Sequence, residues 1–250
     1  MNPSFMRRVL FPAALLALLL SACNPIKTQA YEDDLVMPLA ENSADSLFFV
    51  ISLEYVTGGA APEAQEAMNR AILQQAFDLE EPDGSLEEIA VRYRENLIDE
   101  YLGENSGVNA AGILTWEDKI NGVFTGSCRS WQNYLLSYYS YRGGAHGIQT
   151  VSQLVFDEKT GVLVAEEDLF ADGYKEPVAA LLQEAVKRDM EAEDPELLPL
   201  VEMESVAPNG NFSVGRGGVQ WIFQPYEVGP YALGLVMATV PWDALKPYLK

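Results

Sequence analysis

One histidine occurs in the 250 residues of this chain, and it lies in a glycine-rich stretch that follows several tyrosines. The stretch reads Tyr-Arg-Gly-Gly-Ala-His-Gly from Tyr141 to Gly147. Glycine is common where the backbone takes a positive φ or approaches another group closely, so three glycines in five residues predict a tight turn. Any imidazole-based reaction would have to use His146, and a zinc site with two or more histidines is excluded.

Two interpretations of His146 stay open. In one, the imidazole contributes a polar contact to a binding groove; in the other, a hydrogen-bonded histidine holds the glycine turn against its neighbours. An enzyme would pair His146 with a carboxylate, but 37 acids give no way to choose one. The adjacent acids Glu166, Glu167 and Asp168 precede a helical pattern, where such residues are typical of a solvated cap. We therefore assign no catalytic residue, no metal ligand and no cofactor.

Aromatic residues are concentrated in the segment that leads into the glycine stretch. They could form a face on which a sugar or peptide stacks, or they could pack against helices, as strand aromatics commonly do. The residues concerned are Trp131, Tyr134, Tyr138, Tyr139 and Tyr141.

The first 22 residues have the form of a signal segment. Arg7 and Arg8 precede an apolar run that ends at Leu20, and this run is shorter than the roughly 20 residues that a membrane span needs. The next residues, Leu-Ser-Ala-Cys, resemble the lipobox of bacterial lipoproteins. This resemblance implies cleavage before Cys23 and lipidation of Cys23, which would anchor the protein to a membrane. Asn24, in place of aspartate, favours the outer membrane, facing the periplasm, in a Gram-negative cell.

The chain is strongly acidic. Its 37 Asp and Glu against 16 Lys and Arg give a formal charge of −21. Removal of residues 1–22 takes away two arginines and no acids, so 14 basic residues remain and the charge becomes −23. Such a surface repels nucleic acid and attracts cationic partners. The same charge is also typical of the solubilising surface of an exported protein, and both interpretations stay open. If Cys23 carries lipid, Cys128 has no partner for an intramolecular disulfide, and we expect a small packed residue there.

Hydrophobic periodicity predicts an α+β protein built from antiparallel sheets, with the helices segregated on one face and two small subdomains. We expect a flexible tether over 23–45, an N-terminal module over 46–128 and a C-terminal module over 129–250. Helices are expected at 63–77, 85–102 and 174–190. A first strand is expected from Leu47 to Val56, and a second sheet from strands within 111–165 and 211–240, where Asn121-Gly122 has the form of a hairpin turn.

The Tyr141–Gly147 stretch resembles a domain first described without a function. The similarity continues in Phe156-Asp157, in Thr160-Gly161 and in Asp168-Leu169-Phe170, and it resumes from Phe223 to Ala232 and at Gly234. That domain occurs in the outer half of RsiV-like lysozyme-sensing anti-sigma factors and in front of the catalytic domain of PdaC-type peptidoglycan deacetylases. The similarity spans about 130–250, and 46–128 more weakly resembles the companion module that precedes it.

The resemblance implies a two-part α+β extracytoplasmic module that binds, or lies beside, peptidoglycan-related partners. We expect the motif residues to be the ligand-binding candidates: Tyr141, Gly143, Gly144, His146, Tyr226, Glu227 and Tyr231. The preferred interpretation is a non-catalytic envelope lipoprotein that binds a peptidoglycan-related ligand or a basic protein such as lysozyme. The alternative is a cell-wall-acting hydrolase or deacetylase-like enzyme that uses His146 with a carboxylate.

The lipobox gives a direct prediction. Metabolic labelling with palmitate should mark the wild-type chain and should not mark Cys23→Ser, because the thiol that receives the lipid is missing. Cys128→Ser, which removes the other thiol, is the matched control and should remain labelled. Label that persists in Cys23→Ser would contradict lipidation at this residue.

Overall fold

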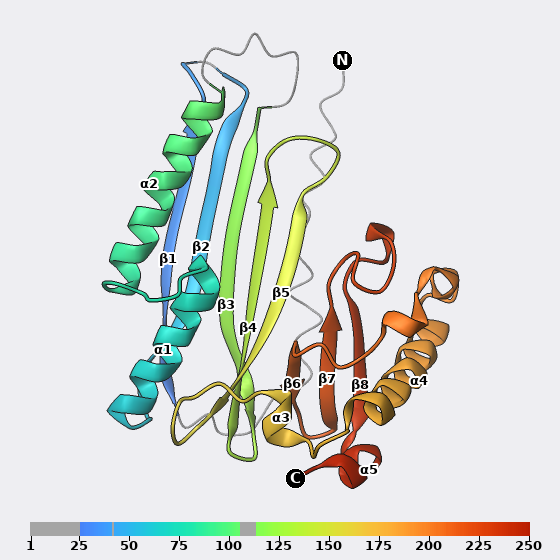
Figure 1. Ribbon diagram of the computed structural model, residues 1–250. Helices are drawn as coiled ribbons and strands as arrows, with labels where there is room; N and C mark the ends of the chain where they lie inside the picture. Colours follow the sequence, from blue (N-terminus) through green and yellow to red (C-terminus); the bar gives the residue numbers. More distant parts are fainter. Residues whose placement is uncertain (1–25, 42, 106–113) are drawn as a thin grey trace.

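The computed structural model describes residues 26–41, 43–105 and 114–250, which form two β-sheets, each with helices packed against it (Figure 1). The larger sheet has five strands in chain order, and the smaller sheet has three, also in chain order. The five strands are β1 (Lys27–Pro38), β2 (Ser46–Gly58), β3 (Trp116–Cys128), β4 (Trp131–Tyr141) and β5 (Ile148–Asp157). The three strands are β6 (Phe212–Val214), β7 (Gly218–Phe223) and β8 (Val236–Pro241). The predicted α+β class is confirmed.

The helices fall where the apolar periodicity places them. Helices α1 (Pro62–Phe77) and α2 (Leu86–Asn105) cover one face of the large sheet, and α4 (Lys175–Glu193) packs on the small one (Figure 1). Pro62 occupies the first turn of α1, where its missing N–H costs nothing. Before α2, the Ser85 hydroxyl and the Glu88 carboxylate bond each other's backbone N–H groups, at 3.2 and 2.8 Å, as in a capping box. Short helices complete the chain: α3 (Glu166–Leu169), α5 (Trp242–Leu245) and the 3₁₀ turns Leu198–Leu200, Met203–Ser205, Tyr231–Leu233 and Lys246–Tyr248.

The large sheet is not purely antiparallel. Strand β2 pairs in parallel with β3, in the register Leu47 with Trp116, while the other neighbours pair antiparallel. Parallel neighbours need a long crossover, and here α1 and α2 supply it. The strands expected within 111–165 therefore join β2 in one sheet, and only the strands expected within 211–240 form a separate one.

The expected tether over 23–45 differs from the structure, because Lys27–Pro38 is the edge strand β1. Its burial alternates along the strand, as the two-residue period of a strand requires. Tyr31, Leu35 and Met37 pack against the helix-side core, and Asp33 forms an ion pair with Arg94 of α2. The acids Glu32 and Asp34 point to the other side and are exposed. The acids of this segment led to the expectation of a solvated linker.

The expected hairpin turn at Asn121-Gly122 is wrong, since β3 continues through it as a single strand. Gly122 faces the helix-side core, where a Cβ would collide with the Tyr134 hydroxyl and the Leu53 side chain. The glycine therefore makes room for a close contact between strands and does not permit a turn.

Side-chain amides join the two sheets. The amide of Asn133 in β4, which is 7% exposed, donates to the Val214 carbonyl and accepts from the Val214 N–H, both at 2.9 Å. Along the free edge of β5, Asn211 and Gln224 bond the Val151 carbonyl at 2.8 and 2.6 Å. The boundary expected between residues 128 and 129 also differs from the structure, because β4 and β5 complete the first sheet and carry this joint.

Each sheet has its own apolar core. Residues of β1 to β5 pack with α1 and α2 in the first core, and α4 packs on β6 to β8 in the second, around the fully buried Trp221. The two hydrogen bonds between the Asn133 side chain and the Val214 backbone join these two parts of the structure and are buried.

We predict that Asn133→Ala lowers the free energy of unfolding by about 2–4 kcal/mol, because the buried N–H and C=O of Val214 lose their partner. Urea denaturation of the soluble chain starting at Asn24 measures this. The exposed amide Gln29 on β1 is the control, and Gln29→Ala should change stability by less than about 0.5 kcal/mol. Equal effects of the two substitutions would show that the bridge contributes little.

Candidate functional site

The glycine stretch forms the turn between β4 and β5. Gly143 and Gly144 have φ of 85° and 98°, in the region that favours glycine. The Tyr141 hydroxyl donates to the Gly144 carbonyl at 3.0 Å across the turn. Tyr141, Gly143 and Gly144 therefore shape the turn that presents His146.

His146 lies flat against Tyr231. The two rings stack with centroids 4.0 Å apart and planes 19° from parallel. Nδ1 of His146 lies 3.0 Å from the Gly147 carbonyl, and because a carbonyl only accepts, Nδ1 carries a proton. The Tyr231 hydroxyl donates to the same carbonyl at 2.9 Å. A Cβ at Gly147 would come within 2.6 Å of the Tyr139 ring, so any other residue there would require that ring to move.

Tyr226 completes a group of rings on the surface. It lies 5.6 Å from Tyr231, centroid to centroid, and its side chain is 65% exposed. Its backbone φ is 72°, unusual for a residue that is not glycine. The Glu227 N–H donates to the Gln224 carbonyl at 3.0 Å, which closes a turn with Pro225 at its second position and Tyr226 at its third. Glycine is the common choice at that third position. We call His146, Tyr226 and Tyr231 the ring cluster.

Glu227 does not face the rings. Its carboxylate accepts from the Gln224 N–H at 2.6 Å and from the Asn209 side-chain amide at 2.7 Å. It therefore stabilises the turn that presents Tyr226. Of the seven candidates named from the sequence, the structure gathers three as rings, and the other four support the two turns.

The aromatic strand divides its side chains between the two faces of the sheet. Tyr134 and Tyr138 point toward the helices, where Tyr134 is buried and packs on Phe124. Tyr139 occupies the opposite face, next to the ring cluster, with the Lys119 ammonium 5.3 Å from the centre of its ring. The packing interpretation is therefore confirmed for Tyr134 and Tyr138, whereas a stacking face for a ligand stays a prediction.

The described contacts of His146 give it no acid partner: they are the Gly147 carbonyl and the Tyr231 ring. The adjacent acids have other roles. Glu166 is buried and accepts from Trp221 Nε1 at 2.6 Å, Tyr174 Oη at 2.9 Å and the Gly210 N–H at 2.9 Å. Asp168 bonds the Ala165 N–H at 2.9 Å at the start of α3.

A second polar cluster, which was not predicted from the sequence, lies on the helix side of the sheet. The fully buried carboxylate of Asp118 accepts from the hydroxyls of Tyr93 (3.1 Å) and Tyr138 (3.0 Å), and it pairs with Arg142 at 2.6 Å. Burial, followed by the Asp118 charge, raises the pKa of Tyr93 far above its usual value. The alternation of Trp116, Asp118 and Ile120 was the available signal, since it places Asp118 on an apolar face.

Cys128 is a buried free thiol, and burial raises the pKa of that thiol. Among the residues that the structure describes, no group of three or more His, Cys, Asp or Glu side chains could hold a metal ion. No helix in the described ranges is long and apolar enough to span a membrane. Residues 1–22 and Cys23 lie outside the described residues.

Comparison with known proteins finds a family match within the C-terminal part of the chain. Residues 167–243 match the DUF3298 family, described as a protein of unknown function. The match includes Tyr226 and Tyr231, and it begins after His146. A search of curated proteins finds no match.

Two crystal structures share the fold over almost the whole chain. A DUF3298 family member from Bacteroides fragilis is similar with a TM-score of 0.79 and 19% identity, covering 91% of this chain and 94% of that one. A DUF3298 family protein from Pseudomonas aeruginosa has a TM-score of 0.69 and 14% identity, covering 91% and 95%. At this identity the similarity establishes the fold, and it includes the five-stranded sheet that lies outside the family match.

We predict that Gly144→Val lowers the melting temperature by a few degrees. The open space around Gly144 leaves room for a side chain, so the cost comes from its φ of 98°, which a β-branched residue tolerates poorly. Gly217→Val is the control, because Gly217 also faces open space but has no such φ. A Gly144→Val protein as stable as the control, yet unable to bind ligand, would make the turn a binding element in its own right.

Proposed function

We propose that this protein is a non-catalytic lipoprotein of the bacterial cell envelope, anchored through Cys23 and facing the periplasm from the outer membrane. It binds a peptidoglycan-related ligand or a basic protein such as lysozyme and does not turn it over. In this it resembles the outer modules of RsiV-like anti-sigma factors and PdaC-type deacetylases. The proposal rests first on the ring cluster.

The ring cluster combines exposure with backbone strain. A tyrosine at a φ of 72° costs of order 1 kcal/mol relative to glycine, and such strain is concentrated at functional sites. The ring gains little from burial, because Tyr226 is mostly exposed. A surface ring held in an unfavourable backbone conformation is better explained by a contact with a ligand than by the stability of the fold.

The rings are also held in place before any ligand arrives. The Gly147 carbonyl accepts from both His146 and Tyr231, so these two rings are tied to one backbone atom. Glu227 in turn holds the Tyr226 turn closed. A rigid aromatic surface binds with a smaller loss of conformational entropy, which suits the stacking of a sugar ring or a protein side chain.

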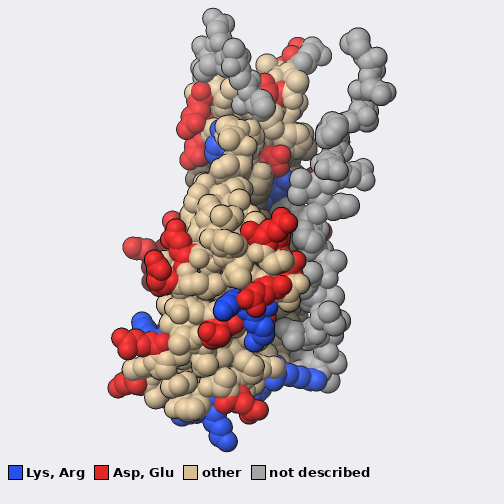
Figure 2. Space-filling model, turned by 90° about the vertical axis from the view of Figure 1, so that its right-hand side faces the viewer, with Lys and Arg blue, Asp and Glu red and all other residues tan. Residues whose placement is uncertain are grey.

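Charge favours a cationic partner. Acidic side chains are found from top to bottom of the face shown in Figure 2, while basic ones lie mainly in its lower half. With a formal charge of −21, the chain has a negative potential that accelerates association with basic proteins. Screening over about 8 Å at physiological ionic strength should slow this association as salt rises, with less effect on dissociation.

The enzyme alternative needs a carboxylate beside His146. The described contacts of His146 are a carbonyl and a ring, an arrangement that orients the imidazole as a contact surface and gives no support to a proton relay. Release of fragments from purified peptidoglycan, abolished by His146→Ala, would overturn the non-catalytic proposal.

The decisive variant is Tyr226→Gly. It removes the exposed ring and relieves the backbone strain, so the melting temperature should stay the same or rise. Affinity for lysozyme or for soluble peptidoglycan fragments, each measured by surface-immobilised binding at low and moderate salt, should fall about tenfold or more, as for a hot-spot tyrosine. Tyr226→Phe keeps the ring and should retain most of the affinity. Unchanged binding by Tyr226→Gly, or no binding of either ligand by the wild-type chain, would contradict the proposal.

A further inference from the structure

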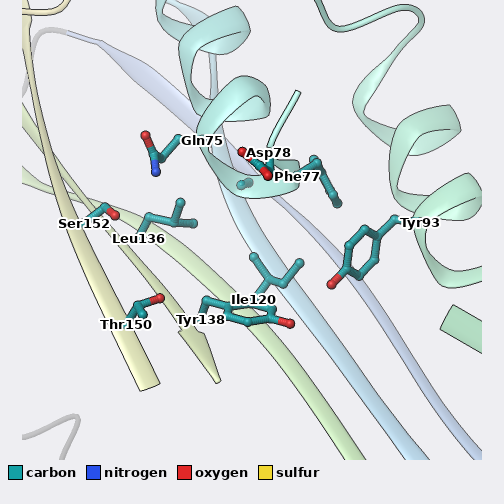
Figure 3. Close-up of a pocket in the computed structure, with 10 residues that line it drawn as sticks. Gln75, Phe77, Asp78, Tyr93, Ile120, Leu136, Tyr138, Thr150 and Ser152 are labelled. Atoms are coloured by element: carbon teal, nitrogen blue, oxygen red, sulfur yellow. The ribbon is translucent and has the colours of Figure 1, made fainter. Parts of the chain in front are cut away.

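A cavity lies on the helix side of the large sheet, and none of the ring-cluster residues lines it. It occupies about 360 Å³ where α1 ends and leaves part of β4 and β5 uncovered (Figure 3). This is near the lower limit for small-ligand pockets, which suits a single side chain or a small molecule. Asp78 and Phe77, from the end of α1, lie across the cavity from Thr150 and Ser152 of β5.

The floor of the cavity offers hydrogen-bond acceptors. The hydroxyls of Tyr93 and Tyr138, which point toward each other in Figure 3, both donate their protons to Asp118. A phenol whose proton is committed in this way has only its oxygen lone pairs left for a ligand. The raised pKa of Tyr93 keeps that proton in place.

The mouth of the cavity adds a negative charge. Asp78 is exposed and ends α1 in a left-handed conformation, with φ of 52°. It is the single acid among the lining residues, and the lining contains no Lys or Arg. The nearby Arg142 is paired with the buried Asp118, so these two charges offset each other. The remaining local charge is that of Asp78.

Apolar groups complete the lining. Ile120 and Leu136 come from the sheet, and Phe77 comes from the helix. The rings of Phe77 and Tyr93 lie 5.4 Å apart, centre to centre. Apolar walls suit a methylene stem, while aromatic rings, acceptor oxygens and a carboxylate suit a positively charged head group.

A neighbouring cavity shows the contrast. It shares Gln75 and Ser152 with the first and is lined mainly by amides. Asn211 and Gln224 bond the edge of β5 there, and the Asn209 amide bonds both Glu227 and the Ile222 carbonyl. Asn211 and Gln224 are thus occupied in joining the two sheets, whereas the Tyr93 and Tyr138 hydroxyls of the first cavity keep oxygen lone pairs for a ligand, beside the Gln75 amide and the hydroxyls of Thr150 and Ser152.

We propose that the first cavity, which Asp78 lines and which we call the Asp78 cavity, binds the side chain of a lysine or arginine presented by a basic partner protein. The cavity supplies acceptors, rings and one carboxylate for the cationic head and apolar walls for its stem. The proposal deepens the proposed function, since it rests on a basic partner, but it concerns residues that the ring cluster does not use. A free amine has the same chemistry, and the experiment separates the two sources.

The first arm uses Nα-acetyl-lysine methylamide as the probe and follows it by NMR titration of the soluble chain. The probe should shift the signals of the cavity residues and saturate, whereas the norleucine analogue, which lacks the ammonium, should not. Asp78→Asn should weaken probe binding about tenfold, as for the loss of a charge-assisted hydrogen bond. Asp83→Asn removes the same charge from an exposed residue outside the cavity and should change it less than about twofold.

The second arm uses lysozyme. Asp78→Asn, but not Asp83→Asn, should weaken lysozyme binding at least fivefold, and the change should lie mainly in the dissociation rate, because the pair between Asp78 and the cationic head is enclosed in the complex while the other acids still steer association. Thr150→Val keeps the side-chain shape and removes a hydroxyl. It should weaken the binding of the lysine probe and of lysozyme less than Asp78→Asn does. Equal effects of the two Asp→Asn variants, or equal binding of the lysine and norleucine probes, would overturn the proposal.

Two outcomes separate this inference from the proposed function. If lysozyme binds wild type and Asp78→Asn equally, the cavity proposal fails and the proposed function stands. If the lysine probe binds in the cavity but lysozyme does not bind at all, the basic-partner part of the proposed function fails, and the cavity is a site for a free amine and not for a protein side chain.

Discussion

The two halves of this protein depend on one buried amide. Asn133 lies near the start of β4, where its N–H and C=O serve the sheet, yet its side chain also completes the hydrogen bonding of Val214 in β6. A backbone group buried away from water needs a partner, and no neighbouring strand reaches β6 on that side. The side chain thus takes the place of a strand, and it fixes the small sheet relative to the large one.

The same solution recurs at two other places in the described structure, one beside the joint and one on β2. Asn211 and Gln224 bond the outer edge of β5, and Asn69 of α1 bonds both backbone groups of Val56 in β2, at 2.8 and 2.9 Å. An exposed strand edge invites pairing with another chain, so these amides also keep the edge of β5 from doing so. They determine the position of the Gln224–Glu227 turn, and through it the position of Tyr226 beside His146.

Local patterns in the sequence predicted most of the elements but little of how they pair. The helices were readable because Pro62 and the Ser85–Glu88 pair are short-range signals. The Asn121-Gly122 pair was misleading. Gly122 is glycine because the Tyr134 hydroxyl of the next strand occupies the space of a Cβ, and no local sequence pattern contains that contact. The acids of β1 concealed its alternation in the same way. At the site, the resemblance located the three rings, but neither it nor the residue pattern revealed the Asp118 cluster, which is assembled from a helix and two strands.

The antiparallel register of β1 places the start of this strand and the His146 turn at opposite ends of the sheet. Lys27 pairs with Gly58 at one end of the sheet, while Leu47 pairs with Trp116, and Glu117 with Tyr141, at the other. A twelve-residue strand is about 40 Å long. Cys23 is four residues from Lys27, a reach of at most about 14 Å. A lipid on Cys23 would therefore hold one end of the sheet at the bilayer and leave His146 at the opposite end, within reach of molecules that never touch the membrane.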